Sequence, residues 1–368
     1  MFDKARFYKD VISLGIGEPD LDTPEEIIEE GCKALRSGKT HYTGNAGIIE
    51  LRQEVSEYLK KFNINADPEG EIIITTGGMG ALALCLLVTI SPGDEVIIQD
   101  PQWLNYYAQV KFAGGVPVPV PAYEENQFRL KAEDIKKKIT DKTKILMINS
   151  PNNPTGAVLD FNDLKEIAEL AIEHDIIVIS DEVYSSLLYD GIVHCSIASL
   201  PQMKERTIVV NSFSKTFAMT GWRVGFASGS REIIEKMTRL QENMVACVAA
   251  PSQYAAIKAL RSMDKAYEMT EIYKRRRDIM IEGLNSIEGI SCYCPKGSFY
   301  LFPNIKKLGK ISEALANDLL EKVGVICIPG SAFGDQGEGY LRISYANSED
   351  NLEEAIKRIK KYVEEQIK

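Results

Sequence analysis

Several features that would mark other protein classes are scarce or missing in this sequence. Only three histidines occur, and none has a metal-ligand spacing such as H-E-x-x-H, so no metal site is expected. The longest apolar run, from Ala81 to Ile90 with Thr89 inside it, reaches about half of the ~20 residues that a membrane helix needs. The formal charge is −10 and there is no basic tract, which argues against a nucleic-acid partner. We therefore expect neither a membrane protein nor a nucleic-acid-binding protein.

Disulfide and zinc patterns are absent as well. The seven cysteines are odd in number and scattered, and most lie in apolar runs such as ALALCLL and GVICIPG. Cys292 and Cys294 lack the second ligand pair of a zinc site. The first residues, MFDKARFYKD, contain no apolar segment of a secretory signal. Buried thiols in a reducing compartment fit this pattern, so we expect a cytoplasmic protein.

What is present is an alternation of strand-like and helix-like segments through the middle of the chain. The 368 residues, 45% apolar and 26% charged, form an ordinary globular composition with room for two domains. Helical patterns such as 163–174 separate most of the apolar, β-branched runs. The runs expected as strands are 71–76, 94–100, 144–150, 175–181 and 207–212. This pattern predicts an α/β fold with a mostly parallel sheet between helices, in which ligands bind at the carboxyl ends of the strands.

The two ends of the chain have a different pattern. Thr23 followed by Pro24 predicts a helix that begins with Thr23 as N-cap and proline at the first helical position. Residues 348–368 carry apolar side chains at helical spacing, and shorter strands are expected in GSFYLFP and YLRISYA. The expected domains are a large α/β domain, residues 30–260, and a smaller α+β domain, residues 1–29 and 261–368.

A glycine-rich turn, TTGGMGALAL, follows the first of these strands and opens a helix. Free N–H groups at a helix N-terminus attract phosphate, and glycines let the phosphate come close. Gly78-x-Gly80-x-x-Ala83 also fits the dinucleotide fingerprint, and Asp100 ends the next strand, where a ribose-binding acid would lie. The turn alone therefore supports a nicotinamide dehydrogenase about as well as any other phosphate-bearing cofactor, and a turn without ligand stays open.

Two further segments place charged groups after strands. Asp181 ends an apolar strand, so its carboxylate is expected at the carboxyl edge of the sheet, although such a residue is more often a helix cap or turn residue. Ser212, Ser214, Lys215 and Arg223 follow another apolar strand within a short stretch. Hydroxyl and guanidinium groups match phosphate oxygens, so this stretch indicates an amine beside an anion site.

Together these pieces fit pyridoxal phosphate better than a dinucleotide. This cofactor needs a lysine for a Schiff base, a carboxylate for its pyridinium nitrogen, an anion pocket and a flat group on its ring. The required residue types occur in chain order near strand ends. They are Gly78, Trp103, Asn153, Asp181, Tyr184, Lys215 and Arg223.

The chain resembles the fold-type I pyridoxal-phosphate enzymes, specifically the class I/II aminotransferases and their aspartate and aromatic subgroup. The resemblance runs from about Val11 to the C-terminus. The matching segments are LGIGEPDLDTP, HYTGNAGIIELR, INSPNNPTGAV, SDEVY, SFSKTFAMTGWR and YLRISYA. It implies a large sheet domain with a smaller domain built from both termini, and a homodimer that moves an amino group between an L-amino acid and a 2-oxo acid.

The resemblance also implies roles for residues that match the family motifs. Lys215 matches the lysine that forms the Schiff base and acts as general base, and Asp181 matches the aspartate paired with the pyridine nitrogen. Tyr184 and Asn153 match the pair that hydrogen-bonds the cofactor's phenolic oxygen. Trp103, in DPQWLNYY, matches the aromatic residue that stacks on the pyridine face. These assignments make Lys215, Asp181 and Tyr184 the expected catalytic residues.

The remaining matches concern the phosphate and the substrate. The expected phosphate ligands are Ser212, Ser214, Arg223 and the backbone at Gly78 and Met79. Tyr42 matches a tyrosine that reaches the phosphate from the neighbouring subunit. Arg342 matches the arginine that binds the substrate α-carboxylate, with help from Asn153 and the backbone at Gly17.

Two departures from the family pattern bear on these expectations. Met79 stands where some acid-specific relatives have lysine, which leaves room for apolar or aromatic substrates, and ordinary packing beside the phosphate turn explains it about as well. Only eleven residues precede Ile12, fewer than relatives usually carry, so site closure and dimer contacts are expected to differ. A carbon–sulfur β-lyase would use nearly the same residues and is the main alternative. Transcription regulators that share this fold need a DNA-binding segment ahead of it, which these eleven residues cannot supply.

Overall fold

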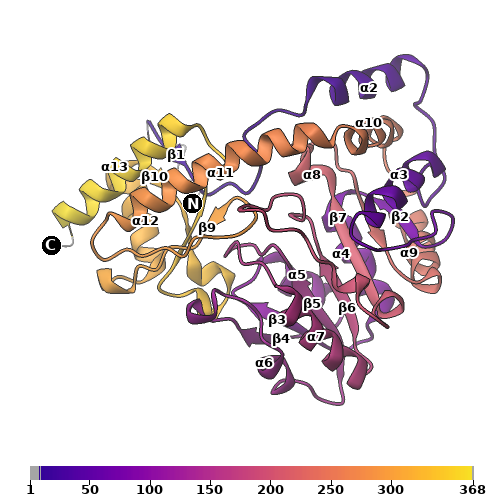
Figure 1. Cartoon of the computed structure of the whole chain (residues 1–368), viewed down its shortest axis with the longest axis horizontal. Coiled ribbons are helices and arrows are strands. Elements are labelled where there is room, and N and C mark those ends of the chain that lie inside the picture. Colours follow the sequence, from indigo (N-terminus) through magenta and orange to yellow (C-terminus); the bar gives the residue numbers. More distant parts are fainter. Residues whose placement is uncertain (1–7, 9, 367–368) are drawn as a thin grey trace.

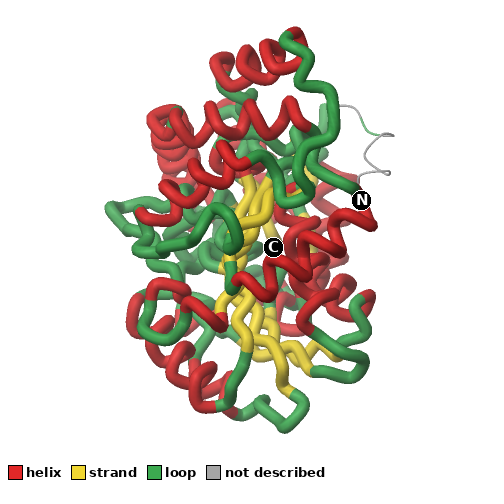
Figure 2. The backbone as a smooth tube through the Cα atoms, turned by 90° about the vertical axis from the view of Figure 1, so that its right-hand side faces the viewer, coloured by secondary structure: helices red, strands yellow, loops and turns green. Residues whose placement is uncertain are grey.

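A seven-stranded sheet lies at the centre of the fold, with helices on both faces (Figures 1 and 2). The computed structural model describes residues 8 and 10–366. All strands run parallel except β8, which is antiparallel to both of its neighbours. In sheet order the strands are β2 (Ile72–Thr75), β8 (Gly225–Ser228), β7 (Thr207–Ser212), β6 (Ile177–Asp181), β5 (Thr143–Asn149), β3 (Glu95–Asp100) and β4 (Val116–Pro121). The predicted α/β fold with a mostly parallel sheet is confirmed.

Alternate residues of the central strands pack against different layers of helices. Val96 and Ile98 of β3 belong to one apolar cluster, which includes Met237 of α9, whereas Ile97 belongs to another with Ile167 of α7. Because both faces of the sheet are covered, the strands read as continuous apolar runs rather than alternating ones. The helices around the sheet are α3 (Ile49–Lys60), α4 (Gly77–Thr89), α5 (Asn105–Phe112), α6 (Ala132–Lys136), α7 (Phe161–Glu173), α8 (Phe213–Thr216), α9 (Arg231–Val245) and α10 (Ala250–Arg261).

The apolar runs of the sequence did not predict two strands of this sheet, β4 and β8. Strand β4 has the sequence VPVPVP, and prolines cannot donate to a sheet ladder. They are tolerated because β4 is an edge strand that pairs only with β3. Strand β8 contains four residues, GFAS, which carry little of the β-branched signal. The other strands of the sheet lie where the apolar runs predicted them.

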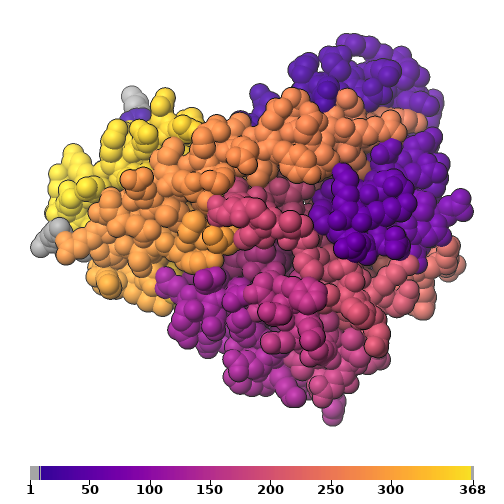
Figure 3. Space-filling model, in the orientation of Figure 1, coloured from indigo at the N-terminus to yellow at the C-terminus, as the bar shows by residue number. Residues whose placement is uncertain are grey.

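A smaller unit packs beside the sheet and combines both ends of the described chain (Figure 1), and Figure 3 shows its C-terminal residues at one end of the molecule. Strand β1 (Ile12–Ser13) pairs in parallel with β10 (Val325–Ile326). Its other elements are β9 (Tyr300–Leu301), β11 (Ile328–Pro329), β12 (Leu341–Ser344), α11 (Met263–Asn285), α12 (Ser312–Val323), α13 (Glu349–Gln366) and the 3₁₀ helices η4 (Lys306–Leu308), η5 (Gly330–Phe333) and η6 (Asp335–Gly337). The predicted C-terminal helix and the two short strands, β9 and β12, are confirmed. The domain limits at residues 30 and 260 stay a prediction.

The helix α2 (Glu25–Arg36) begins without the predicted cap. Pro24 occupies the N-cap position and no side chain caps the helix, so the assignment of Thr23 was wrong. The Thr23 hydroxyl instead donates to the backbone oxygen of Ala218 at 2.6 Å and accepts from Nε1 of Trp222 at 3.1 Å. These partners lie far along the chain, so no local pattern could predict them.

Three short 3₁₀ helices lie in the connections of the sheet unit. They are η1 (Glu124–Asn126), η2 (Ile197–Ser199) and η3 (Lys204–Arg206).

Among the described residues, no helix combines the length and the apolar character required to span a bilayer.

Candidate active site

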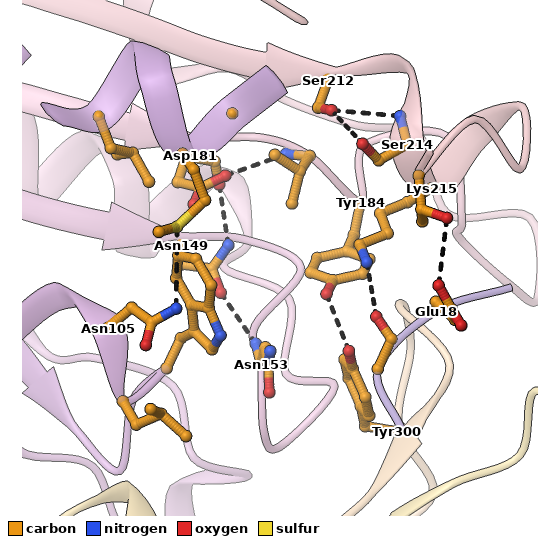
Figure 4. Close-up of a pocket in the computed structure, with 18 of the residues that line it drawn as sticks. Glu18, Asn105, Asn149, Asn153, Asp181, Tyr184, Ser212, Ser214, Lys215 and Tyr300 are labelled. Atoms are coloured by element: carbon orange, nitrogen blue, oxygen red, sulfur yellow. Dashed lines mark hydrogen bonds between the residues drawn. The ribbon is translucent and has the colours of Figure 1, made fainter. Parts of the chain in front are cut away.

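A cavity of about 700 Å³ opens between the sheet and the smaller unit, at the carboxyl ends of the central parallel strands (Figure 4). Parallel strands deliver the residues that follow them to one edge, which is where α/β sheets bind ligands. Every predicted site residue except Tyr42 lines this cavity. They are Gly17, Gly78, Met79, Trp103, Asn153, Asp181, Tyr184, Ser212, Ser214, Lys215, Arg223 and Arg342. Residues that are scattered over most of the sequence therefore meet in one place.

Asp181 provides a buried carboxylate at the end of β6. Its Oδ2 accepts a 2.6 Å hydrogen bond from the Tyr106 hydroxyl, and its Oδ1 accepts one of 3.2 Å from the backbone N–H of Val183. Burial raises the pKa of Asp181 to about 6, because the low-dielectric surroundings disfavour the charged form. A cation bound beside this carboxylate would stabilise its charged form and so offset part of the free-energy cost of burying the charge.

Lys215 projects from α8, the short helix that directly follows β7. The Ser212 hydroxyl caps this helix by accepting from the backbone N–H of Ser214 at 3.1 Å. The Lys215 amine, Nζ, donates to the backbone oxygen of Gly17 at 2.6 Å. Burial lowers the pKa of Lys215 to about 8, well below the ordinary range of a lysine. An appreciable fraction of this amine is therefore uncharged near neutral pH and can act as a base or a nucleophile.

Hydroxyl, guanidinium and backbone N–H groups gather where α4 begins. The Ser212 hydroxyl donates to that of Ser214 at 2.8 Å. Arg223 donates to the backbone oxygens of Thr220 at 2.8 Å and Thr76 at 3.3 Å. Gly77, the first residue of α4, adopts φ 72°, a conformation that favours glycine, and the Arg223 guanidinium would have to shift to make room for a Cβ there. A helix N-terminus, two hydroxyls and a guanidinium together suit a phosphate group.

Arg342, on β12, is the buried cation of the smaller unit's side of the cavity. Its guanidinium donates to the backbone oxygen of Gly15 at 2.6 Å and to Oδ1 of Asn153 at 3.2 Å. The guanidinium carbon lies 4.7 Å from the ring centroid of Tyr300 and 4.9 Å from that of Phe333. Its Nε is buried, and the described part of the chain offers it no hydrogen-bond partner. A buried guanidinium that is held by two hydrogen bonds at a cavity wall suits a carboxylate ligand.

Asn153 and Tyr184 occupy the space between these charged groups. The backbone N–H of Asn153 donates to Oδ1 of Asn149 at 2.8 Å, and the Asn149 amide donates to the backbone oxygen of Asp181 at 3.0 Å. The hydroxyls of Tyr184 and Tyr300 lie 3.1 Å apart (Figure 4). These contacts hold the backbone at Asn153 and the hydroxyl of Tyr184 in place.

Several cavity residues were missed by sequence reasoning, notably Tyr106, Asn149 and Tyr300. Tyr106 packs edge-on against Trp103, with ring centroids 5.3 Å apart and an interplanar angle of 87°. A helical spacing of three residues between the two aromatics was the available signal for Tyr106. Tyr300 had no comparable signal, because GSFYLFP reads only as a buried strand.

Tyr42 lies outside the cavity, and 89% of it is exposed. The backbone N–H of the next residue, Thr43, donates to Sγ of Cys247 at 3.4 Å, so this loop lies against the segment that follows α9. The predicted role of Tyr42 concerns the cavity of a second subunit and stays a prediction.

Comparison with known proteins gives one family along the whole chain. The family described as aminotransferase class I and II matches residues 9–359. An aspartate aminotransferase from Pyrococcus abyssi is 51% identical over 369 residues, covering 99% of this chain and 95% of that protein. Aromatic-amino-acid aminotransferase 2 from Thermococcus litoralis is 48% identical with the same coverage.

Solved structures show the same relationship. An aromatic aminotransferase from Pyrococcus horikoshii has a TM-score of 0.95 and 49% identity, covering 99% of each chain. The aspartate aminotransferase from Thermus thermophilus with maleate has a TM-score of 0.92 and 39% identity, covering 98% of this chain and 94% of that one. These relatives are all named aminotransferases, and they give the carbon–sulfur lyase alternative no support. The chain therefore belongs to the class I and II aminotransferases of fold type I, and the reaction it catalyses is the transfer of an amino group.

Proposed function

We propose that this aminotransferase holds pyridoxal phosphate in the cavity and uses Lys215, Asp181 and Arg342 on an L-amino acid and a 2-oxo acid. The single observation that carries the proposal is the convergence of a half-buried amine, a buried carboxylate and a buried guanidinium on one cavity. When bound, the cofactor supplies an aldehyde that condenses with amines and a ring that takes up electrons from the substrate's α-carbon.

The residues present fit that cofactor. The Lys215 amine would hold it covalently, and Ser212, Ser214 and Arg223 match its phosphate in charge and hydrogen-bonding type. Asp181, whose burial raises its pKa to about 6, would gain from a cationic ring nitrogen and would keep that nitrogen protonated. Trp103 offers a flat surface for the ring.

Lys215 is proposed as the group that moves the proton. Once the substrate's amino group has replaced Lys215 on the cofactor, the freed Nζ would accept the proton from the α-carbon of the substrate and later return it. This requires an amine that is uncharged at the start. Because burial lowers the pKa of Lys215 to about 8, the amine titrates close to physiological pH, where a general base is most effective. Tyr184 and Asn153 would donate hydrogen bonds to the cofactor's phenolic oxygen.

Arg342 is proposed to bind the α-carboxylate that amino acids and 2-oxo acids share. Two of its donors already hold Gly15 and Asn153, which fixes the plane of the guanidinium. The Arg342 guanidinium and the neighbouring backbone at Gly17 both line the cavity and would orient the ligand. A fixed guanidinium plane favours one orientation of the carboxylate and thereby presents the α-carbon toward Lys215.

Several apolar side chains line the cavity. Ile16, Met79 and Leu104 line it and are partly exposed. Glu18, which accepts from the Thr220 hydroxyl at 3.1 Å, adds a negative charge. Relatives of this chain are named for aspartate and for aromatic amino acids. Because this lining favours apolar groups over a second carboxylate, we propose aromatic amino acids as the better donors.

We further propose a cytoplasmic homodimer. The exposed side chain of Tyr42, on a loop that contacts Cys247, would complete the phosphate pocket of the partner. All seven cysteines lie among the described residues and are unpaired, as expected in a reducing compartment.

The test is a panel of L-phenylalanine, L-tyrosine, L-aspartate and L-glutamate with 2-oxoglutarate or pyruvate as acceptor, read by initial rates. Keto-acid-dependent product and its loss in Lys215→Ala support the proposal. Pyruvate and ammonia released from cystathionine without any acceptor would contradict it. Sedimentation of the active enzyme tests the dimer.

A further inference from the structure

Asp100 is a buried carboxylate that the proposed function leaves unused. It ends β3, is 5% exposed, and is absent from the lining of the cavity. The dinucleotide interpretation of the glycine-rich turn predicted that Asp100 binds a ribose. The chain belongs to the class I and II aminotransferases, so that role no longer explains why Asp100 is there. A charge buried without a ligand needs partners in the protein itself.

The partners of Asp100 lie in the smaller unit. Its Oδ2 accepts from the backbone N–H of Asp335 at 3.1 Å, and its Oδ1 accepts from that of Gln336 at 3.3 Å. These N–H groups open the 3₁₀ helix η6, so the carboxylate acts as its N-terminal cap from another part of the chain. Gly334, at φ 122°, precedes them, and a Cβ there would collide with the carboxylate. The segment is therefore shaped around Asp100.

The same segment carries the ring that packs on Arg342. The 3₁₀ helix η5 ends at Phe333, directly before Gly334. The backbone N–H of Gln102 donates to the backbone oxygen of Phe333 at 2.9 Å, which is a second bond between the end of β3 and this segment. Phe333 is fully buried, with its ring centroid 4.9 Å from the Arg342 guanidinium carbon. A continuous series of contacts thus joins Asp100 to Arg342.

We propose that Asp100 is a positioning residue for carboxylate binding: by holding residues 333–336 it keeps the Phe333 ring against Arg342 and so fixes the guanidinium plane. The inference rests on the proposed role of Arg342. Two ionisable groups interact electrostatically with Asp100. Burial raises the pKa of Asp100 and the negative charge of Asp335 on η6 adds to this, while burial and the charge of Asp100 raise the pKa of Tyr107 on α5. Loss of the Asp100 charge leaves one backbone N–H without an acceptor and loosens the segment.

The experiment measures binding of 3-phenylpropanoate, a carboxylate without an amino group, to the pyridoxal-phosphate-loaded enzyme by calorimetry. We expect Asp100→Asn and Phe333→Leu each to weaken binding about tenfold, since each disturbs the support of one charge-assisted contact. We expect kcat/KM for L-phenylalanine to fall by a similar factor while kcat changes less than about twofold, because ground state and transition state share the carboxylate contact. The double variant should lose much less than the product of the two effects, since both act on one route.

Asp94→Asn is the matched control. Asp94 precedes the same strand at its other end, where its carboxylate accepts from the backbone N–H of Ser91 at 2.8 Å. Its affinity for the probe should stay within about twofold of the parent, as for a surface turn. Any thermal destabilisation by Asp100→Asn without a change in affinity would show a structural role only and overturn the inference.

Arg342→Lys separates the two proposals. Unchanged affinity in this variant would remove Arg342 as the carboxylate site, and the proposed function would fail at that point. Weakened binding in Arg342→Lys together with normal binding in Asp100→Asn, or independent effects in the double variant, would overturn only the inference. If Asp100→Asn does not fold, Phe333→Leu decides, because unchanged affinity there breaks the link to Arg342.

Discussion

The Tyr106 hydroxyl donates a 2.6 Å hydrogen bond to Oδ2 of Asp181, and both residues are buried in the wall of the cavity. This bond stabilises the carboxylate form of Asp181, whereas burial favours the protonated form. Burial also raises the pKa of Tyr106 far above its usual range, and the Asp181 charge adds to this, so the hydroxyl keeps its proton. Tyr106 is therefore a donor that holds Asp181 ready for a cationic partner.

Removing the Tyr106 hydroxyl should lower the affinity of the protein for the cofactor. In Tyr106→Phe we expect the pKa of Asp181 to rise further and pyridoxal phosphate to bind about tenfold more weakly, as for loss of one hydrogen bond to a charged group. Equilibrium dialysis with the cofactor measures this. Tyr267→Phe, at an exposed position on α11, is the control and should bind normally. Equal affinities in the two variants would show that the 2.6 Å contact has no energetic role.

The apoprotein should be less stable at neutral pH because of Asp181. Burial raises its pKa in the folded state to about 6, above the value in the unfolded chain. Proton binding by Asp181 therefore stabilises the folded state in acid, and this stabilisation is lost as the pH rises through 6. A shift of this size corresponds to roughly 2–3 kcal/mol. We expect Asp181→Asn apoprotein to exceed the parent in denaturant midpoint at pH 7.5, and the gap to close near pH 4. A gap that does not change with pH would contradict this account.

Capture of the cofactor by the apoprotein should depend on pH through Lys215. Burial lowers the pKa of its amine to about 8, and only the uncharged amine attacks an aldehyde. The initial rate should therefore rise with pH and reach half of its maximum near pH 8, whereas ordinary surface lysines titrate near ~10.4. Stopped-flow absorbance measures the rate, and Lys215→Ala provides the blank. A midpoint near 10 would indicate an amine exposed to water.

The adjacent Glu182 forms a buried cluster with His194 that should matter for stability rather than chemistry. Its Oε2 lies 2.7 Å from Nε2 of His194, and its Oε1 accepts from the hydroxyls of Ser180 and Ser196 at 2.8 and 2.6 Å. Breaking a buried pair leaves polar groups unsatisfied, so Glu182→Gln should cost about 3–5 kcal/mol in the free energy of unfolding.

A second Glu–His pair of this chain provides the comparison for that measurement. Oε1 of Glu173 and Nε2 of His174 lie 3.9 Å apart, and their side chains are 59% and 33% exposed. Because exposed pairs contribute about 0–1 kcal/mol, Glu173→Gln should barely change the urea midpoint. Equal losses in the two variants would mean that burial adds nothing to the Glu182 cluster.

Substrate choice should respond to Met79. Its side chain is 39% exposed at the cavity, and its sulfur lies 3.7 Å from Nδ2 of Asn105. In Met79→Lys a cation would face the end of the substrate, so kcat/KM for L-aspartate relative to L-phenylalanine should increase about tenfold or more. Met244→Lys, at an exposed methionine outside the cavity, should leave the ratio unchanged. If the ratio is unchanged in both variants, residues other than Met79 determine which substrate is preferred.

The sequence was informative where function depends on residues that follow strands. Asp181, Ser212 and Lys215 come directly after apolar runs, and the sheet brings them to one edge, as the pattern predicted. Arg342 was found through the family motif alone, since nothing in YLRISYA indicates which cavity it faces. Its contact with Gly15 joins opposite ends of the chain.

What escaped prediction depended on tertiary partners. Thr23 looked like a cap, but its hydroxyl bonds to Ala218, which only the folded chain brings near. Tyr300 supports both Tyr184 and Arg342, although a lone tyrosine in a strand reads as core. Asp100 matched a ribose-binding position in sequence, yet its carboxylate caps a helix of the other unit. Side chains whose partners lie far along the chain leave no local signature.

The pairing of β1 with β10 sets an order of events during synthesis. Ile12 emerges early from the ribosome, but its partner Val325 and the guanidinium of Arg342 come near the end of translation. The last strand of the central sheet ends at Ser228, so the chain that carries Lys215 and Asp181 is complete while the nascent chain still lacks Arg342. Residues translated near the end of synthesis therefore supply the wall of the cavity that carries Arg342.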